Sequence, residues 1–270
     1  MDGPSEQVQA ARIVLHEACA LFAEHGDDAV LVGGWVPDLR FPAADPAHIG
    51  SIDVDMALRL ERAPHEAVVT LLSERGFRAG ANPYQFLKDV PFAGGRTIAV
   101  RLDLLTSVRH HAAEFGDHPA RGAPEPVHGA DIAFRDNSVM PIGPAADNLQ
   151  IRVAGIVAFL VMKGIALVDR PERRAKDAYD IHFCLEQYPD GIAGLVEEFV
   201  PWLEDELVRE GLAKMGSKFR SEEDEGPRMV ADVEEVFGES RAMRKLAVYT
   251  RVDAFLAAVR AARPPDGGGQ

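Results

Sequence analysis

Ser51-Ile52-Asp53-Val54-Asp55-Met56 is the stretch that decides how this chain is interpreted. It is an apolar run typical of a β-strand, and it carries two acidic residues one position apart. Because successive side chains point to opposite faces of a strand, Asp53 and Asp55 share one face and the apolar residues share the other. Two carboxylates on one face of a rigid strand are costly unless something positive lies between them. The usual occupant is a hard divalent cation that holds a polyphosphate.

A third acid, Asp103, lies on the clearest alternating stretch of the chain, Thr97 to Leu105. Apolar residues occupy one face of this predicted strand, and Asp103 lies with Arg101 on the opposite, polar face. Asp103 therefore repeats the pattern of Asp53 and Asp55. If the two strands are neighbours in a sheet, the three carboxylates converge.

A glycine pair, Gly33-Gly34, precedes these strands in the chain. It follows a short buried strand, Ala29 to Val32, and leads into a short helix that begins near Trp35. Glycine allows a backbone to approach a ligand closely, and helix amides can receive phosphate oxygens. A plain turn from strand to helix is the alternative explanation of the pair.

The patterns divide the chain into two parts. Residues 1–148 predict an α/β (α+β) domain with a mixed sheet and an N-terminal helix, and residues 149–262 predict an all-helical domain. Residues 263–270, rich in glycine and proline, predict a disordered tail. Within residues 107–144 we expect one short strand near 132–134, and the first helix of the second domain is expected at 152–167.

Composition excludes several classes of protein. The net charge of −14 disfavours non-specific binding to nucleic acid, although a local basic groove remains compatible with it. No apolar stretch is long enough to cross a bilayer, and the N-terminus lacks the basic and apolar regions of a secretion signal. Cys19 and Cys184 are expected to be buried thiols. These features predict a cytoplasmic protein.

The ordered set of strand, glycine pair, acid-x-acid strand and later acidic strand resembles the DNA polymerase beta-type nucleotidyltransferase superfamily. The resemblance is carried by Leu31-Val32-Gly33-Gly34, Ile52-Asp53-Val54-Asp55-Met56 and Arg101-Leu102-Asp103-Leu104. A second block comprises Lys163-Gly164-Ile165-Ala166-Leu167, then Arg170, Arg173 and Lys176-Asp177-Ala178-Tyr179-Asp180-Ile181. This block is similar to the AbiEii/AbiGii-type nucleotidyltransferases of type IV toxin–antitoxin systems.

The resemblance implies transfer of a nucleoside monophosphate from a nucleoside triphosphate to an acceptor hydroxyl, with Mg²⁺ or Mn²⁺ as cofactor. Asp53 and Asp55 would be shared metal ligands, and Asp103 would complete the site of the metal that activates the hydroxyl. Lys163 would neutralise the β- and γ-phosphates, and Asp180, or else Asp177, would orient that lysine or the acceptor. The remaining residues expected to meet the nucleotide are Gly33, Gly34, Arg173 and Lys176.

The sequence departs from the family pattern after the glycine pair. Many members have Gly-Ser there, with a hydroxyl that contacts phosphate, whereas Trp35 follows Gly34 here. The proline-containing interval between Gly34 and Asp53 is also longer than usual. We expect Ser51 or Arg40 to supply the missing contact.

Three functions remain open at the level of sequence. The first is a type IV toxin that modifies RNA, in particular a tRNA 3′ end, and is paired with a cognate antitoxin. The second keeps the chemistry but transfers to a small aminoglycoside- or lincosamide-like molecule, which an acidic cleft would suit. The third is a non-catalytic protein that binds a nucleotide or a partner, although the three acids of the metal set argue against it.

Overall fold

The computed structural model describes residues 5–116, 121–143, 148–170, 172 and 174–263. It divides the chain into two compact units, Met1–Gly155 and Ile156–Gln270. The division follows strand β8 (Gln150–Ala154), whereas the sequence placed the boundary at residue 148, before that strand. Of the predicted disordered tail, residues 264–270 lie outside the described part of the chain.

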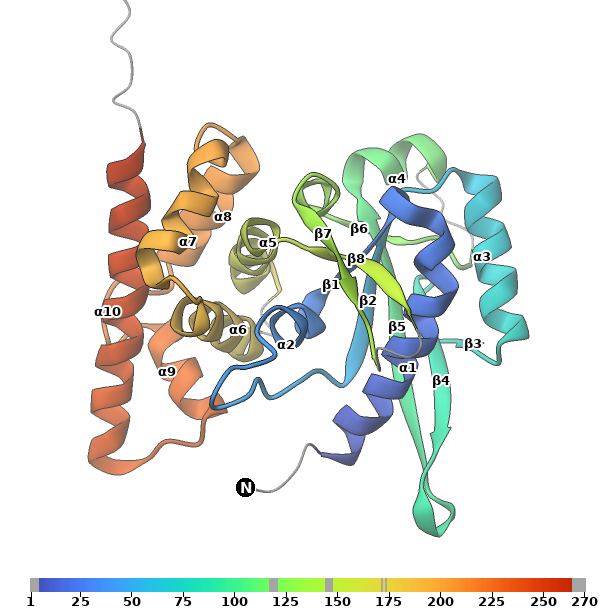
Figure 1. Ribbon diagram of the computed structural model, residues 1–270, viewed down its shortest axis with the longest axis horizontal. Helices are drawn as coiled ribbons and strands as arrows, with labels where there is room; N and C mark the ends of the chain where they lie inside the picture. The colour runs from blue at the N-terminus through green and yellow to red at the C-terminus, as the bar shows by residue number, and fades with distance from the viewer. Residues whose placement is uncertain (1–4, 117–120, 144–147, 171, 173, 264–270) are drawn as a thin grey trace, which may run out of the picture. The chain divides into compact units, whose positions relative to one another are not determined.

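Unit 1 is built on a mixed sheet that has eight strands among the described residues (Figure 1). Its strands are β1 (Ala29–Val32), β2 (Asp53–Leu58), β3 (Arg78–Ala79), β4 (Gln85–Pro91), β5 (Thr97–Ser107), β6 (Glu125–Val127), β7 (Asn137–Pro141) and β8. The order across the sheet is β3-β4-β5-β2-β1-β8-β7, and β6 pairs with β5. This mixed sheet with its helices is the fold class that the sequence predicted.

The described residues of unit 1 also form four α-helices: α1 (Glu6–Phe22), α2 (Val36–Arg40), α3 (Arg62–Glu74) and α4 (Val108–Glu114). Ser5 caps α1 by accepting a hydrogen bond from the backbone N–H of Val8, at 3.3 Å. Helix α1 contacts β2, β4, β5 and β8, so its apolar stripe covers the central strands.

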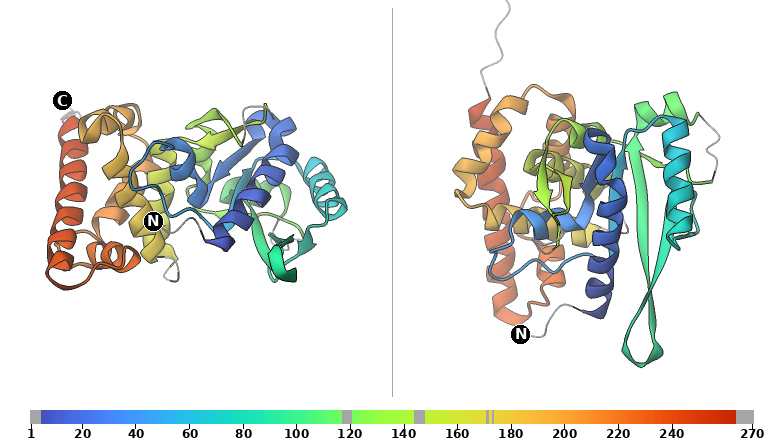
Figure 2. Two further views of the ribbon diagram at one scale, coloured as in Figure 1. Left: turned by 60° about the horizontal axis from the view of Figure 1, so that its bottom comes forward. Right: turned by 45° about the vertical axis from the view of Figure 1, so that its right-hand side comes forward.

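Strands β4 and β5 form an antiparallel hairpin, which is long and twisted in the right-hand view of Figure 2. The twist follows from the right-handed preference of L-residues in extended backbone. Strand β5 starts where the sequence predicted, at Thr97, and continues to Ser107. Its inner part pairs in parallel with β2, and this pairing brings the two acidic strands side by side.

Two secondary-structure predictions are wrong. Residues 132–134 lie in a 3₁₀ turn (Ala130–Phe134), and the strands of this region are β6 before it and β7 after it. The expected helix at 152–167 is two elements: β8, which pairs in parallel with β1, and α5 (Ile156–Asp169). Only Gly155 separates the two elements, so the sequence is one continuous apolar run. Hydrophobic periodicity cannot distinguish a strand from a buried helix in such a run.

Unit 2 is helical throughout its described residues. Its helices are α5, α6 (Arg174–Gln187), α7 (Gly191–Phe199), α8 (Glu206–Gly216), α9 (Glu225–Val233) and α10 (Gly238–Ala262). Helix α5 is mostly buried and contacts α6 and α8, while the long α10, red in Figure 1, lies against α7 and α9. Helices α5 and α8 approach closely at two glycines: a Cβ on Gly164 would lie 2.3 Å from the carbonyl oxygen of Gly211.

A charged cluster ties α6 to α10 in unit 2. Arg244 donates to Glu186 at 3.0 Å and also bonds Glu234. His182, 1% exposed, lies beside Glu186 with 3.9 Å between Nδ1 and Oε2. Burial, assisted by the charge of Arg244, lowers the pKa of His182 to about 3. His182 is therefore neutral in the folded protein.

The buried histidine predicts a specific loss of stability in acid. The unfolded chain binds a proton at His182 below about pH 6.5, whereas the folded chain does so only near pH 3. The contribution of His182 is thus complete above pH 6.5 and falls as the pH drops. We expect His182 to remove about 2 kcal/mol of unfolding free energy between pH 7 and pH 5.

Urea unfolding of the wild type and of His182→Gln at both pH values measures this term. The variant should lose less stability than the wild type over the same interval. Equal losses would show that His182 is protonated with an ordinary pKa in the fold.

Two further findings concern the whole described chain. None of its helices is both long enough and apolar enough to span a membrane. Cys19 and Cys184 are both buried, and burial raises the pKa of the Cys19 thiol to about 12. Both thiols are therefore packing residues, as expected.

Candidate active site

The three predicted acids lie side by side on the two central strands of unit 1. In the parallel pairing of β2 and β5, Asp55 is the register partner of Asp103, and Asp53 is the partner of Arg101. Neighbouring strands are about 4.8 Å apart, so side chains on one face of such a pair are in reach of each other. The alternation on β5 therefore holds, and Asp103 shares a face with Asp53 and Asp55.

The opposite face explains why these strands hold the acids rigidly. Val54, Met56, Leu102 and Leu104, which alternate with the charged residues, are all 0% exposed. A slip of one residue in either strand would bury the carboxylates and expose this apolar set, so the register is strongly fixed. Asp53 and Asp103 are themselves largely buried, with 9% and 5% exposure.

Gly33 makes room for Asp55. Its φ is +74°, and a Cβ there would lie 2.0 Å from Oδ2 of Asp55. The glycine pair opens a 3₁₀ turn (Gly33–Trp35) followed by α2 (Val36–Arg40), a helix of only five residues. The helix whose backbone amides were expected to receive phosphate is thus very short. The contact that the structure shows for Gly33 is with the carboxylate of Asp55.

Trp35 and Ser51 position the backbone and the side chain of Asp53, respectively. The indole Nε1 of the fully buried Trp35 donates to the backbone carbonyl of Asp53 at 2.8 Å. Ser51 Oγ donates to Asp53 Oδ1 at 2.7 Å. Trp35 is therefore a packing residue that anchors β2, and Ser51 orients a predicted metal ligand.

Arg101 bridges two of the acids and was not among the site residues predicted from sequence. Its guanidinium bonds Asp53 through Nη2 and lies 3.0 Å from Asp103 Oδ2 through Nε. The signal was available in the alternation of β5, which places Arg101 on the same face as Asp103, two positions before it.

The donor set fits a divalent metal in chemistry. Among the described residues, no three His, Cys, Asp or Glu side chains form a cluster that could hold a metal ion as they stand. The guanidinium of Arg101 lies between Asp53 and Asp103. Carboxylate oxygens are the ligands that Mg²⁺ prefers. The arginine also shows that this face holds a cation against two of its carboxylates. We therefore treat Asp53, Asp55 and Asp103 as residues that could hold the metal.

Arg40 serves the scaffold of unit 1. Its guanidinium donates to the backbone carbonyls of Ala154 and Val153, at 2.6 and 3.0 Å, and to Ser138 Oγ at 3.1 Å. These bonds tie the end of α2 to β7 and β8. We assign Arg40 a structural role in place of the expected phosphate contact.

The predicted residues of the second block form an ion cluster inside unit 2. Lys163 on α5 lies 2.6 Å from Asp177 Oδ1 and 2.8 Å from Asp180 Oδ2, both on α6. Lys176 bonds the other oxygen of Asp180, one turn away on the same helix. Asp177 and Asp180 are three residues apart and share one face of α6. Arg173 lies outside the described residues.

The two lysines of this cluster respond differently to it. Burial lowers the pKa of Lys163, but the attraction of Asp177 and Asp180 outweighs burial and raises it overall. For Lys176, burial and the charge of Lys163 outweigh Asp180, and its pKa is lowered. Lys163 is thus firmly cationic. The two lysines and two aspartates balance in charge, so these four residues make no basic patch.

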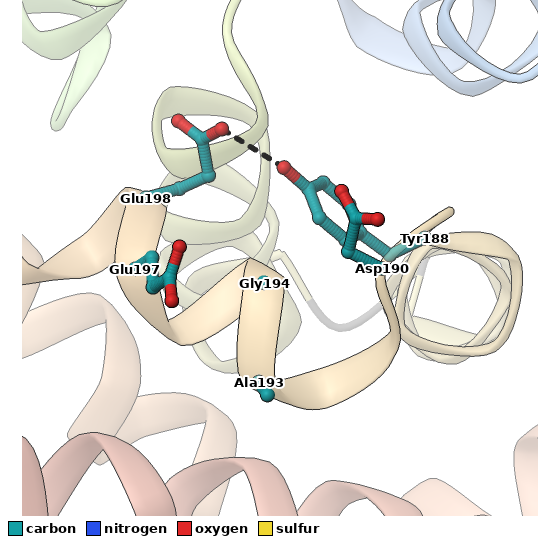
Figure 3. A pocket seen from close by; sticks show the side chains of 6 residues that line it. All are labelled: Tyr188, Asp190, Ala193, Gly194, Glu197 and Glu198. Atoms are coloured by element: carbon teal, nitrogen blue, oxygen red, sulfur yellow. Dashed lines mark hydrogen bonds between the residues drawn. The ribbon is translucent and has the colours of Figure 1, made fainter.

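An acidic pocket of about 530 Å³ lies between the end of α6 and helix α7. Figure 3 shows its lining, with Tyr188 donating to Glu198 at 2.9 Å and with Asp190 and Glu197 nearby. Three carboxylates would repel a triphosphate. We therefore assign the nucleotide elsewhere.

Acids on two parallel central strands, preceded by a strand and a glycine turn, define a nucleotidyltransferase. A sequence model of the family described as "Nucleotidyl transferase AbiEii toxin, Type IV TA system" matches residues 50–258. The chain belongs to this family, and its activity is nucleotidyl transfer in a type IV toxin–antitoxin system. The family predicted from the sequence is thereby confirmed.

Other comparisons add little to this assignment. Among solved structures, the chain is similar to an antigenic nucleotidyltransferase-like protein from Paracoccidioides brasiliensis. The two share 12% sequence identity with a TM-score of 0.48, over 78% of this chain and 88% of that one. No curated protein matches the sequence.

Proposed function

We propose that the protein transfers a nucleoside monophosphate from a nucleoside triphosphate to a hydroxyl of RNA, at the 3′ end of tRNA, in a reaction that requires Mg²⁺. The observation that carries the metal requirement is the parallel pairing that sets Asp55 beside Asp103, with Asp53 on the same face. The RNA acceptor rests on membership of the toxin family.

In this proposal the chain supplies a rigid frame for the reacting groups. Asp53, Asp55 and Asp103 hold the metal, which would supply positive charge beside the attacking hydroxyl and the α-phosphate. Ser51 fixes the rotation of the Asp53 carboxylate, and Gly33 lets Asp55 lie against the backbone. Preorganised groups of this kind need no rearrangement as charge develops, which is the main source of catalysis in phosphoryl transfer.

The reaction forms one P–O bond and breaks another. The acceptor oxygen attacks the α-phosphorus, forms a new P–O bond and loses its proton to bulk water. The bond from the α-phosphorus to the bridging oxygen breaks, and pyrophosphate leaves. The three acids form no covalent bond with the nucleotide in this scheme, so the nucleoside monophosphate passes directly to the acceptor.

The acceptor is tested by incubating the protein with each radiolabelled nucleoside triphosphate and total RNA, with and without Mg²⁺, followed by a denaturing gel. We expect label in the tRNA band that disappears with EDTA. Parallel reactions with an aminoglycoside and a lincosamide, separated by chromatography, test the small-molecule alternative. Label only in these reactions would overturn the RNA acceptor, and no label anywhere would overturn the enzymatic proposal.

A cognate antitoxin is the partner that the family implies. Expression of the protein alone should arrest growth, and co-expression of the neighbouring antitoxin gene should restore it. Unimpaired growth at high expression would argue against a toxin role.

Lys163 is proposed to act on the triphosphate as well as in the ion cluster of unit 2. An ammonium that bonds phosphate oxygens is worth about 1.5–3 kcal/mol, so Lys163→Ala should weaken nucleotide binding about 10- to 100-fold. Lys163→Arg should recover part of the loss, because a planar fork does not occupy the same point. Calorimetric titration with a non-hydrolysable triphosphate measures both variants.

The matched control for Lys163 is Lys214→Ala, which removes a lysine bonded to Asp169 at 2.8 Å on the surface of unit 2. This control should bind nucleotide as the wild type does. Wild-type affinity in folded Lys163→Ala would restrict Lys163 to its structural role.

A further inference from the structure

Arg101 occupies a position in the acidic face that needs an explanation beyond strand pairing. It is the register partner of Asp53 in the parallel pairing of β2 and β5, and it precedes Asp103 by two residues on β5. Two of the three acids proposed to hold the metal, Asp53 and Asp103, therefore contact one arginine. A basic residue in the centre of a metal-binding set opposes metal binding by its charge.

The contacts of Arg101 are with the same oxygens that a metal would need. Its guanidinium bonds Asp53 Oδ2 and lies 3.0 Å from Asp103 Oδ2, while Ser51 takes Asp53 Oδ1. The Arg101 side chain is 29% exposed, whereas those of Asp53 and Asp103 are 12% and 7% exposed. The arginine thus covers the two carboxylates from the solvent side, where a cation would enter.

We propose that Arg101 is the resident counter-ion of the acidic face and competes with the divalent metal for Asp53 and Asp103. This inference rests on the proposed function, because it assumes that these acids hold the metal. Without metal, the guanidinium neutralises part of their repulsion and keeps the strands paired. Metal binding requires the guanidinium to turn away, so Arg101 lowers the affinity for free metal.

The competition gives the arginine a use in the reaction. A metal that arrives bound to a triphosphate brings anionic oxygens, which offer the displaced guanidinium a new partner of the kind it prefers. Free metal offers none. Arg101 therefore favours the metal–nucleotide complex over metal alone.

The test is Mn²⁺ binding to the full chain without nucleotide, measured from the electron paramagnetic resonance signal of free Mn²⁺ at low ionic strength. We expect Arg101→Gln to bind at least about tenfold more tightly than the wild type, because one opposing charge is removed. Arg101→Lys should lie between them, since a point charge cannot bridge two carboxylates as a fork does. Arg78→Gln is the matched control, because Arg78 pairs with the exposed Asp89 at 3.1 Å, and it should bind as the wild type does.

Thermal unfolding gives a second readout. Mn²⁺ should raise the melting temperature of Arg101→Gln more than that of the wild type, because the variant leaves the acids without their counter-ion. Binding by Arg101→Gln that is equal to or weaker than binding by the wild type overturns the inference. Loss of that binding in Asp55→Asn is required by the proposed metal set. Its persistence there would overturn the metal assignment and leave Arg101 a structural ion-pair partner.

Discussion

Replacing Asp55 by Asn is expected to abolish nucleotidyl transfer while leaving the fold intact. The amide has the size of the carboxylate and still fits against Gly33, so packing is preserved. The lost ligand charge should cost several kcal/mol in the transition state, which corresponds to a decrease in rate of about a thousandfold or more. Transfer of label from the preferred nucleoside triphosphate measures the rate, and circular dichroism checks the fold.

The matched control for Asp55→Asn is Asp89→Asn, which changes an acid on β4 of the same sheet. Asp89 pairs with Arg78 and is about half exposed, at 52%. This variant should transfer at the wild-type rate. Full activity in Asp55→Asn would remove Asp55 from the metal set. If Asp55→Asn does not fold, Asp55→Glu takes its place. That variant should also be inactive, because the longer side chain moves the carboxylate oxygens.

Replacing Asp180 by Asn is expected to destabilise unit 2 strongly. Asp180 is 0% exposed and serves both Lys163 and Lys176. Removing one member of a buried ion cluster leaves the remaining charge without compensation, which typically costs about 3–5 kcal/mol. Urea unfolding monitored by fluorescence and helical dichroism measures the loss.

Asp169→Asn is the control for this prediction, since it breaks an ion pair of the same two residue types with Lys214 at the surface. Exposed pairs contribute about 0–1 kcal/mol, so the control should change stability little. A loss below about 1 kcal/mol in Asp180→Asn would mean that water reaches the cluster and compensates the lysines.

The sequence predicted the part of the site that depends on short-range periodicity. The alternation of β5 placed Asp103 on the polar face, and the Asp-x-Asp spacing placed Asp53 with Asp55. Both placements hold, because a strand with one fully buried face has only one register that avoids burying charge. The family assignment followed from these residues in order.

The sequence could not predict contacts between residues far apart in the chain. Strand β8 pairs with β1, more than a hundred residues earlier, and its apolar run gave no sign of where the strand ends and α5 begins. Arg40 looked available to phosphate, but two of its hydrogen bonds go to backbone carbonyls, which every residue carries and no motif reveals. Arg101 could be placed on the acidic face, but its contact with Asp53 on the neighbouring strand depends on the pairing of β2 with β5.

The close approach of Gly33 to Asp55 has a consequence for protein engineering. At most positions with a left-handed backbone, asparagine is an acceptable replacement for glycine. Position 33 excludes it, because at the φ of +74° that Gly33 adopts a Cβ would lie 2.0 Å from Oδ2 of Asp55. In a library that randomises both positions and selects for folded protein, we expect glycine at 33 wherever an acid remains at 55. Asparagine should be recovered at 33 together with glycine at 55, in clones that fold but have lost a metal ligand, because a Cβ at 33 would also lie 2.9 Å from the Cβ of residue 55.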